Sequence, residues 1–191
     1  MPEKREDRRI RHTKRAIKNA FFELMDEKPV DKISVTELCE RADINRSSFY
    51  AHYVDYPAFL DELECEIAEK NIELFADLYM RTDYPEVIVR NMLQLIKTKK
   101  EMKLFFSDYG NHKGVTRLNE YVYAKAMPMW LKSGVTDTAK AEMLFLYVIR
   151  GGYAILKQWY DSGFAMQEEE VNELLTTVIT HGLYSFVHIR L

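Results

Sequence analysis

One short helix of this chain is bounded at both ends by strong signals, and these restrict how the first third can fold. The segment Ser34-Val35-Thr36-Glu37 is a capping box, in which the serine hydroxyl accepts a hydrogen bond from a backbone amide and the glutamate bonds back to the serine. Ile33 and Leu38 occupy the positions of a hydrophobic staple. The helix is predicted to end near Ala42, because the residues that follow break its apolar pattern.

A second helix start follows almost at once. Asn45 is placed as the next N-cap, with Ile44 and Phe49 as its staple, for a helix over about 46–53. Two capped helices that meet across about three residues have the spacing of a helix-turn-helix. Phe49 and Tyr53 would anchor the second helix in the core and leave its hydrogen-bonding residues exposed, as a helix that enters a DNA groove requires.

Longer helices are predicted on both sides of this pair. Apolar residues recur at helical spacing from Ile10 to Leu24, and that helix should stop near Lys28-Pro29, since proline cannot continue the hydrogen-bond ladder. Asp55 is placed to cap a fourth, long helix. Only 7 Gly and 5 Pro interrupt the chain. Its later apolar patterns predict five more helices, near 84–98, 100–109, 114–132, 137–161 and 167–189, so that the sequence predicts an all-α protein of about nine helices.

The charge is unevenly distributed along the chain. The net charge is -3, yet residues 1–20 carry eight Lys or Arg against three acidic residues, and the remainder is acidic. A basic end on an acidic body indicates a surface that faces a polyanion, although terminal charge runs are more often simply solvated. Both interpretations stay open on the charge alone.

Residues 9–69 resemble the DNA-binding domain of the TetR family. The resemblance is carried by Ile33 to Ala42 and by Ile44 to Tyr53, which have the family's residue types at the family's spacing. It implies a three-helix DNA-binding domain over 9–69, with the helix-turn-helix at about 33–52, and a helical ligand-sensing and dimerisation domain over 80–191. The DNA-binding residues indicated by the resemblance and by the charge pattern are Lys14, Lys18, Ser34, Thr36, Asn45, Arg46, Ser47, Ser48, Tyr50 and His52.

The sequence departs from the family's pattern at two places. Asp43 stands where the turn usually has glycine, and Tyr56-Pro57 replaces the Lys-Glu that often opens the fourth helix. The sequence therefore leaves open whether this chain makes the phosphate contact of that lysine, and Tyr56 offers only a neutral substitute. Among the candidates, Asn45 is explained by capping alone, while a packed position in the core is the rival explanation for Tyr50.

The C-terminal helices carry a second, weaker resemblance. The segment from Tyr147 to Trp159 resembles the penultimate helix of a common TetR-family C-terminal domain. The last two helices are apolar on more than one side, and the resemblance implies that a partner chain covers the second side in a four-helix bundle. Gly151-Gly152 inside a helix fits either a close helix approach or a plain kink. The predicted dimerisation residues are Gly151, Leu174, Leu175, Val178, Ile179, Gly182 and Phe186.

The middle of the chain is rich in aromatic residues and methionine. Such a set is more often plain core than the lining of a cavity, but the family resemblance favours a cavity. The candidate ligand-binding residues are Phe105, Tyr109, Tyr123, Met127, Trp130 and Trp159.

These features lead to one leading hypothesis and one alternative. The leading hypothesis is a homodimeric repressor that binds double-stranded DNA at an inverted repeat and is released by a small hydrophobic effector. The alternative is a helix-turn-helix regulator without a small-molecule ligand, which acts as an activator or through a protein partner. An enzyme is disfavoured, because the sequence has no HExxH, GxSxG, Walker or GxGxxG motif.

No catalytic residue, metal site or cofactor is predicted. The two cysteines lack CxxC spacing and the five histidines are scattered. The first residues are charged, and no apolar run approaches the roughly 18 residues that a membrane span needs. The sequence therefore predicts a cytoplasmic protein that does not enter a membrane.

Overall fold

The computed structural model describes residues 2–81, 85–108, 112–132 and 137–182, and within these ranges it leaves out the side chains of 2–7, 73–81, 85, 129 and 182. The chain forms two compact units. Unit 1 comprises residues 1–67 and 103–115, and unit 2 comprises residues 68–102 and 116–191. The chain therefore passes between the units three times.

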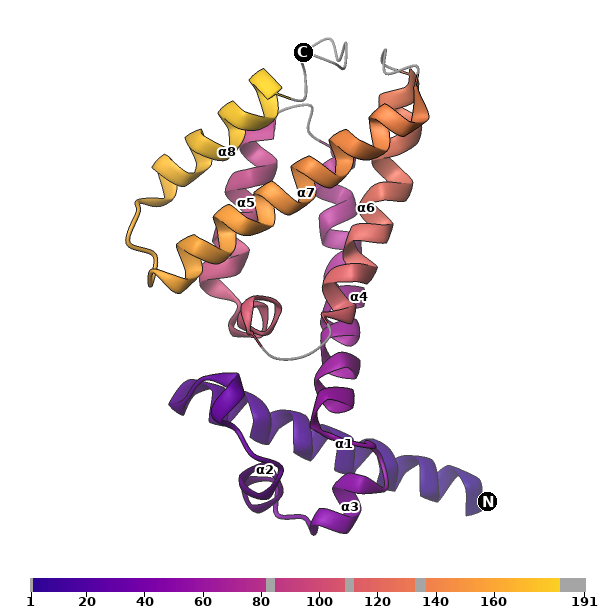
Figure 1. Ribbon diagram of the computed structural model, residues 1–191. Helices are drawn as coiled ribbons and strands as arrows, with labels where there is room; N and C mark the ends of the chain where they lie inside the picture. The colour runs from indigo at the N-terminus through magenta and orange to yellow at the C-terminus, as the bar shows by residue number, and fades with distance from the viewer. Residues whose placement is uncertain (1, 82–84, 109–111, 133–136, 183–191) are drawn as a thin grey trace. The chain divides into compact units, whose positions relative to one another are not determined.

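All regular structure in the described ranges is helical, as predicted, and Figure 1 shows the order of the helices along the chain. The α-helices are α1 (Pro2–Glu27), α2 (Val35–Arg41), α3 (Arg46–Tyr50), α4 (Tyr56–Arg81), α5 (Pro85–Thr98), α6 (Lys113–Lys132), α7 (Thr138–Asp161) and α8 (Glu168–Gly182). Two 3-10 helices are present, η1 (Val30–Lys32) and η2 (Lys100–Phe106). The helix predicted near 100–109 is thus the 3-10 helix η2.

Two helix boundaries differ from the prediction. Helix α1 begins at Pro2 instead of near Ile10, because the charged residues between them are good helix formers and none of them interrupts the ladder. Helix α3 ends at Tyr50, earlier than predicted. The amides of His52 and Tyr53 both bond to the carbonyl of one residue, Phe49, so the last turn tightens and the chain leaves the helix.

The core of unit 1 is built from aromatic side chains of α1, α3 and α4. Phe59 on α4 is 1% exposed, and its ring centroid lies 5.3 Å from that of Phe21 on α1. Phe49 on α3 lies 6.0 Å away from the Phe59 ring, and Tyr53 lies 5.1 Å away. All three are edge contacts, which add about 0.5–1.5 kcal/mol each to the gain from burial. Phe59 therefore joins the three helices that the helix-turn-helix needs as its frame.

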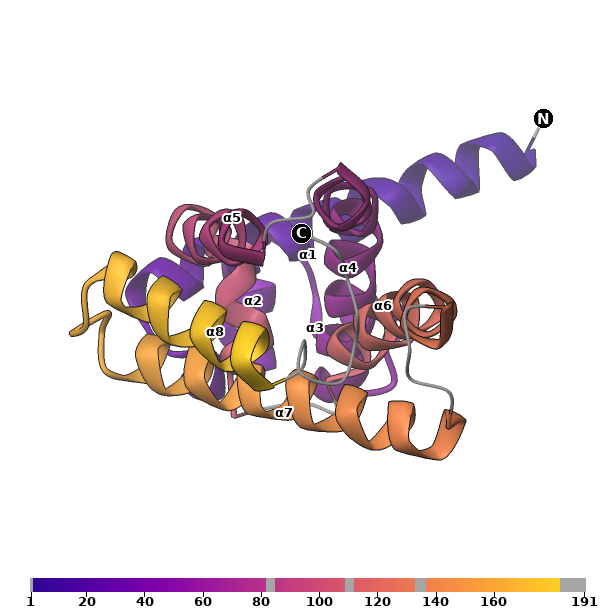
Figure 2. The ribbon, with the colours of Figure 1, turned by 90° about the horizontal axis from the view of Figure 1, so that it is seen from above.

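In unit 2, α8 packs against both α5 and α7. The two views in Figures 1 and 2 show α7 and α8 running side by side. Leu93 of α5 and Val171 and Leu175 of α8 are buried. An ion pair of 3.1 Å between Lys97 and Glu168 also links α5 to α8. Apolar burial is the larger contribution, since exposed ion pairs are worth about 0–1 kcal/mol.

A second apolar cluster joins α6 to α7 within unit 2. Met127 and Trp130 of α6 and Phe145 of α7 are its largest buried members. The Trp130 and Phe145 rings lie 6.1 Å apart, and Tyr123 meets the Phe145 ring edge-on at 5.1 Å. These side chains therefore fill space against one another.

Candidate nucleic-acid interface

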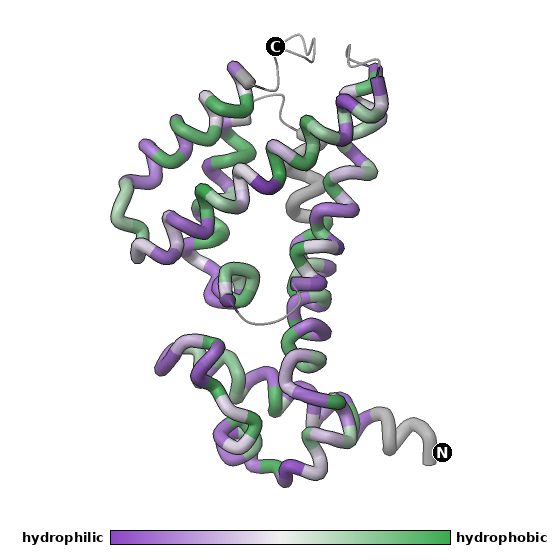
Figure 3. Tube along the Cα trace, viewed as in Figure 1, coloured by the Kyte–Doolittle hydropathy of each residue, from purple (hydrophilic) through white to green (hydrophobic). Residues whose placement is uncertain are grey.

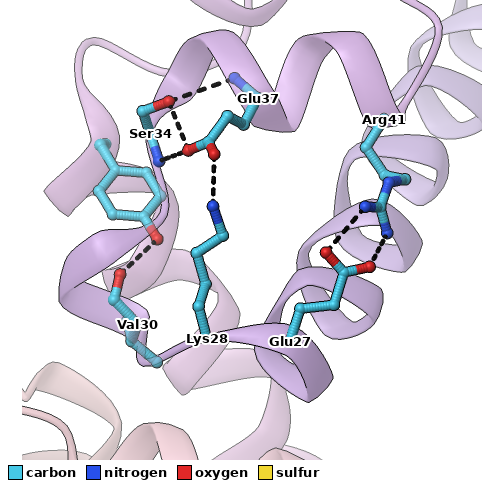
Figure 4. Close-up of polar contacts among 7 residues, drawn as sticks. Glu27, Lys28, Val30, Ser34, Glu37 and Arg41 are labelled. Atoms are coloured by element: carbon cyan, nitrogen blue, oxygen red, sulfur yellow. Dashed lines mark hydrogen bonds and ion pairs between the residues drawn. The ribbon is translucent and has the colours of Figure 1, made fainter.

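The start of α2 is closed by its own side chains. The Glu37 amide donates to Ser34 Oγ at 3.3 Å, and the Ser34 amide donates to Glu37 Oε2 at 3.0 Å, which completes the predicted capping box. The Ser34 hydroxyl also donates to Glu37 Oε2 at 2.8 Å. Figure 4 shows this closed set of bonds. The side chain of Ser34 remains exposed, so capping and a contact with a phosphate are compatible.

Two ion pairs tie the end of α1 to α2 (Figure 4). Lys28 pairs with Glu37, and Arg41 holds Glu27 through two bonds of 2.8 and 3.0 Å. The hydrogen bond from Lys28, followed by those from Ser34, lowers the pKa of Glu37 to about 2. The glutamate is therefore ionised above that pH, and its favourable effect on folding is lost only as the pH falls from about 4.5 towards 2. Its charge also suits the positive end of the helix dipole.

The turn between α2 and α3 is a Schellman motif. The Ile44 amide donates to the Cys39 carbonyl at 3.0 Å, and the Asp43 amide donates to the Glu40 carbonyl at 3.2 Å. Asp43 has a φ of 53°, in the left-handed region that normally favours glycine. Aspartate tolerates this conformation better than most residues do. The departure from the family's glycine therefore preserves the geometry of the turn.

The recognition helix α3 is buried on one side and exposed on the other. Phe49 is fully buried, whereas Arg46 and Ser47 are exposed. Tyr50 is 46% exposed, which excludes a packed position in the core of this chain. The Arg46 guanidinium lies 5.9 Å from the centroid of the Tyr50 ring, so the two side chains stack on the open face.

The other predicted DNA-binding residues of the helix-turn-helix belong to the same unit and are exposed or half-buried. Asn45 has the extended backbone of an N-cap, but its side chain makes no capping hydrogen bond, contrary to the capping prediction. Its amide is therefore available to a ligand, since Asn45 is exposed. Thr36 is exposed at the start of α2, and Ser48 and His52 are half-buried. The motif thus gathers polar side chains from α2 and α3 within one unit.

Lys14 and Lys18 have intramolecular partners. Lys14 Nζ lies 2.8 Å from Glu62, and Lys18 pairs with Glu66 one turn further along both helices. Lys14 also lies 5.2 Å from the centroid of the Tyr53 ring. These lysines therefore connect α1 to α4, and any phosphate contact would have to compete with a carboxylate.

Tyr56 does not offer the neutral phosphate contact that the sequence left open. Its side chain is 8% exposed, and its hydroxyl donates to the carbonyl of Val30 at 3.2 Å. The residue is part of the core, because its ring stacks 6.0 Å from that of Phe59.

The candidate ligand-binding residues do not form one group. Tyr123, Met127 and Trp130 belong to the cluster between α6 and α7 in unit 2, whereas Phe105 lies in the part of η2 that belongs to unit 1. Trp159 closes the end of α7, since its Nε1 donates to the Met166 carbonyl at 2.8 Å. The remaining candidate, Tyr109, lies outside the described residues.

The candidate dimerisation residues on α8 fall on two different sides. Leu174 is 43% and Val178 37% exposed, whereas Leu175 is 3% exposed and lies in the core of unit 2. Ile179 packs against the cluster between α6 and α7. Gly182 is the last residue of α8. Phe186 lies outside the described residues.

Helix α7 carries exposed apolar residues that the sequence did not single out. Met143 is 73%, Leu146 52% and Tyr147 62% exposed. Gly151 follows on the same helical stripe, and a Cβ there would meet nothing within 4 Å. The helix runs through Gly151 and Gly152 without a break, so no contact among the described residues explains the Gly151 position. Figure 3 shows apolar and polar residues alternating along α7 and α8.

Among the described residues, no group of three or more His, Cys, Asp or Glu side chains is placed to hold a metal ion. None of the described helices is both long and apolar enough to cross a membrane.

The fold and the motif define a class, that of helical proteins with an N-terminal helix-turn-helix domain. Among solved structures, the chain matches a TetR transcriptional regulator from Streptococcus agalactiae 2603V with a TM-score of 0.61 and 25% identity. The match covers 91% of this chain and 97% of that chain. No family model and no curated protein matches the sequence. The chain thus has the fold of this TetR transcriptional regulator, and the match, with the helix-turn-helix motif, supports its assignment to the TetR family.

Proposed function

We propose that the chain regulates transcription by binding an inverted-repeat DNA sequence as a homodimer, with α3 in the major groove. The observation that carries this proposal is the open face of α3, where Arg46 and Tyr50 stack and Asn45 has no capping bond. Arginine can form two hydrogen bonds with the major-groove edge of guanine, and asparagine with that of adenine. The neighbouring start of α2 supplies Ser34 and Thr36 for phosphate oxygens.

The test of this proposal is a selection of duplexes from a random pool with the purified protein, followed by fluorescence anisotropy. We expect an inverted repeat to be enriched. Arg46→Ala should weaken binding to the selected duplex by about 1–3 kcal/mol and affect a scrambled duplex much less, because it removes contacts with base edges.

Arg90→Ala is the matched control, since Arg90 is an exposed arginine of α5 in unit 2. It should leave both affinities unchanged. Equal losses on selected and scrambled duplexes for Arg46→Ala would contradict base recognition by this residue. Failure to enrich any sequence would contradict specific DNA binding altogether.

The dimer is proposed to form through α7 and α8. The supporting observation is the pair of exposed apolar stripes, Met143, Leu146 and Tyr147 on α7 and Leu174 and Val178 on α8. Two such helices from each chain would make a four-helix bundle, and the open space beside Gly151 would admit a partner helix closely. A symmetric dimer also presents two copies of α3 to the two halves of an inverted repeat.

Release by a small hydrophobic effector is the proposed mode of regulation, and repression is its proposed direction. Support comes from the aromatic and methionine side chains of unit 2, such as Met127 and Trp130. The alternative, a regulator without a small-molecule ligand, is favoured by the direct packing of Trp130 on Phe145 and by the structural role of Trp159. A thermal-shift screen of apolar compounds, followed by titration of each hit against the DNA complex, separates the two. If an effector lowers the affinity of the protein for DNA by some factor, DNA must lower the affinity of the protein for the effector by the same factor.

A further inference from the structure

A buried carboxyl group lies where α4 meets the start of α6 within unit 1. The Glu64 side chain is 0% exposed, although acidic residues are almost never fully buried without a partner. It occupies the apolar side of α4, between the buried residues Leu60 and Ile67. Neither DNA recognition nor dimerisation uses this group. The burial of this carboxyl group therefore needs a separate explanation.

The contact between the two helices depends on a glycine. A Cβ on Gly114 would lie 2.5 Å from the backbone oxygen of Glu64 and 2.7 Å from its Cβ. Real Cβ atoms do not approach so closely, so only glycine allows the start of α6 to lie against α4 here. The Gly114 amide donates to Glu64 Oε2 at 3.2 Å, which makes the carboxyl group the polar link across this contact.

The titratable neighbours of Glu64 come from both helices. His112 Nδ1 lies 3.4 Å from Glu64 Oε1. Asp61, one turn earlier on α4 and also buried, pairs with Lys113 at 2.8 Å, and Cys65 is the next residue on α4. Burial is the main reason why the pKa of Glu64 is raised to about 7, and the charge of Asp61 adds to it, while the Gly114 amide acts in the opposite direction.

We propose that Glu64 is a proton-dependent latch that holds the start of α6 against α4 when its carboxyl group is protonated and releases it when the proton is lost. The neutral group can stay in this apolar contact and still accept the Gly114 hydrogen bond, whereas an ionised carboxylate is disfavoured there by the loss of water. When the contact between α4 and the start of α6 opens, water can hydrate the Glu64 carboxylate again.

The latch acts at a junction of the chain. The chain leaves unit 1 inside α4 after Ile67 and inside α6 after Val115, and both exits lie within four residues of a latch residue. A closed latch fixes these two exits to each other, and an open one frees the start of α6. Protonation of one side chain thereby determines whether these two exits of unit 1 are held together.

The closed and open states differ in the pKa of Glu64, so closure of the contact depends on pH. The group has a raised pKa in the closed state, so closure is most favourable at low pH and weakens as the pH rises towards 7 and above. With a pKa of about 7 when closed and the ordinary value of 4.5 when open, closure should weaken by about tenfold between pH 6 and pH 8.

The test is amide hydrogen exchange at the start of α6 in the full-length, DNA-free protein, corrected for the intrinsic pH dependence of exchange. It requires no DNA, so its outcome is independent of the proposed function. In the wild type, the protection of the Gly114 amide should fall by about tenfold from pH 6 to pH 8. A pH-independent protection in the wild type overturns the proposal without any variant.

Three variants assign the effect to its source. Glu64→Gln keeps the shape and the acceptor but cannot ionise, so its protection should be independent of pH. Glu62→Gln, the matched change in an exposed pair on the same helix, should retain the wild-type dependence. His112→Asn should also retain it. A pH dependence that persists in Glu64→Gln, or that is lost in His112→Asn instead, assigns the titration to another group and overturns the proposal.

Discussion

In unit 1 the buried aromatic side chains of α1, α3 and α4 meet at Phe59, and the start of α2 is closed by a capping box and an ion pair. In unit 2 a comparable core exists around Trp130 and Phe145, but α7 and α8 also carry large apolar side chains on their outer sides, such as Leu146 and Leu174. An apolar surface that a single chain leaves open is typical of a protein interface, whereas a polar surface with arginine suits a polyanion. The exposed surface of unit 1 thus suits a polyanion, whereas that of unit 2 suits another protein surface.

The largest expected effect tests whether the cores of the two units are independent. Phe59→Ala should lower the free energy of unfolding by about 3–5 kcal/mol, since it removes the ring that α1, α3 and α4 share. Both tryptophans, Trp130 and Trp159, lie in unit 2, so their fluorescence reports on that unit while circular dichroism reports on both. We expect urea to reduce the helical signal of the variant before it changes the fluorescence.

Tyr50→Ala serves as the control, because this ring is exposed and outside the aromatic core. It should change the unfolding free energy by no more than about 0.5 kcal/mol. Coincident transitions by both signals in Phe59→Ala would show that the units unfold as one body.

The next effect concerns the apolar surface of unit 2. Leu174→Glu should raise the dissociation constant of the dimer by at least about a hundredfold, because an unpaired charge would enter an apolar interface. Analytical ultracentrifugation over a concentration series measures it. Leu175→Ala should instead lower the free energy of unfolding by about 2–5 kcal/mol, since that side chain is buried inside the unit. If the wild type is monomeric at micromolar concentration, Leu174 is not part of a dimer interface and this prediction is wrong.

A smaller effect compares the helix caps of the two units. Ser34 caps α2 in unit 1, and Asp137 caps α7 in unit 2 by accepting from the amides of Ala139 and Lys140. Replacement of either cap by alanine should cost about 1 kcal/mol of stability. Ser47→Ala, on the exposed face of α3, is the control and should cost less than half of that. A much larger loss at one cap would show that its role goes beyond closing the helix.

The smallest effect concerns the lysines of α1. Lys14→Ala removes an exposed pair with Glu62 and should lower the unfolding free energy by about 1 kcal/mol at most. If the lysine is engaged with that carboxylate, the salt dependence of DNA binding should stay unchanged. A decrease of the salt slope by about one unit would show instead that Lys14 leaves Glu62 for a phosphate when DNA binds.

The sequence predicts the capping box and the end of α1 because the signals for them are local. The capping box at Ser34 and the stop before Pro29 depend on residues a few positions apart, and both are confirmed. The start of α1 was missed because the residues before Ile10 are mostly charged helix formers, and these carry no apolar period in the sequence. The end of α3 was missed because it depends on how Tyr53 meets the core.

The sequence predicts less where a residue's partner is distant along the chain. A helical stripe shows that Leu174 and Leu175 are both apolar, but it does not show which of them faces α5 and which faces outward. Likewise, the basic face of α1 is visible in the sequence, while the carboxylates that meet Lys14 and Lys18 come from α4. Glu64 did leave a signal, a charged residue on an apolar stripe, but its meaning required the contact with Gly114.

The left-handed backbone at Asp43 also sets which amino acids this position can accept over evolutionary time. Glycine and asparagine adopt such a φ readily, whereas a β-branched side chain is strained there. In a saturation library, variants with Gly or Asn at this site should therefore survive selection for a folded protein, and those with Val, Ile or Thr should be depleted. The site therefore accepts few amino acids, and a glycine at this position in other chains would satisfy the same geometric requirement.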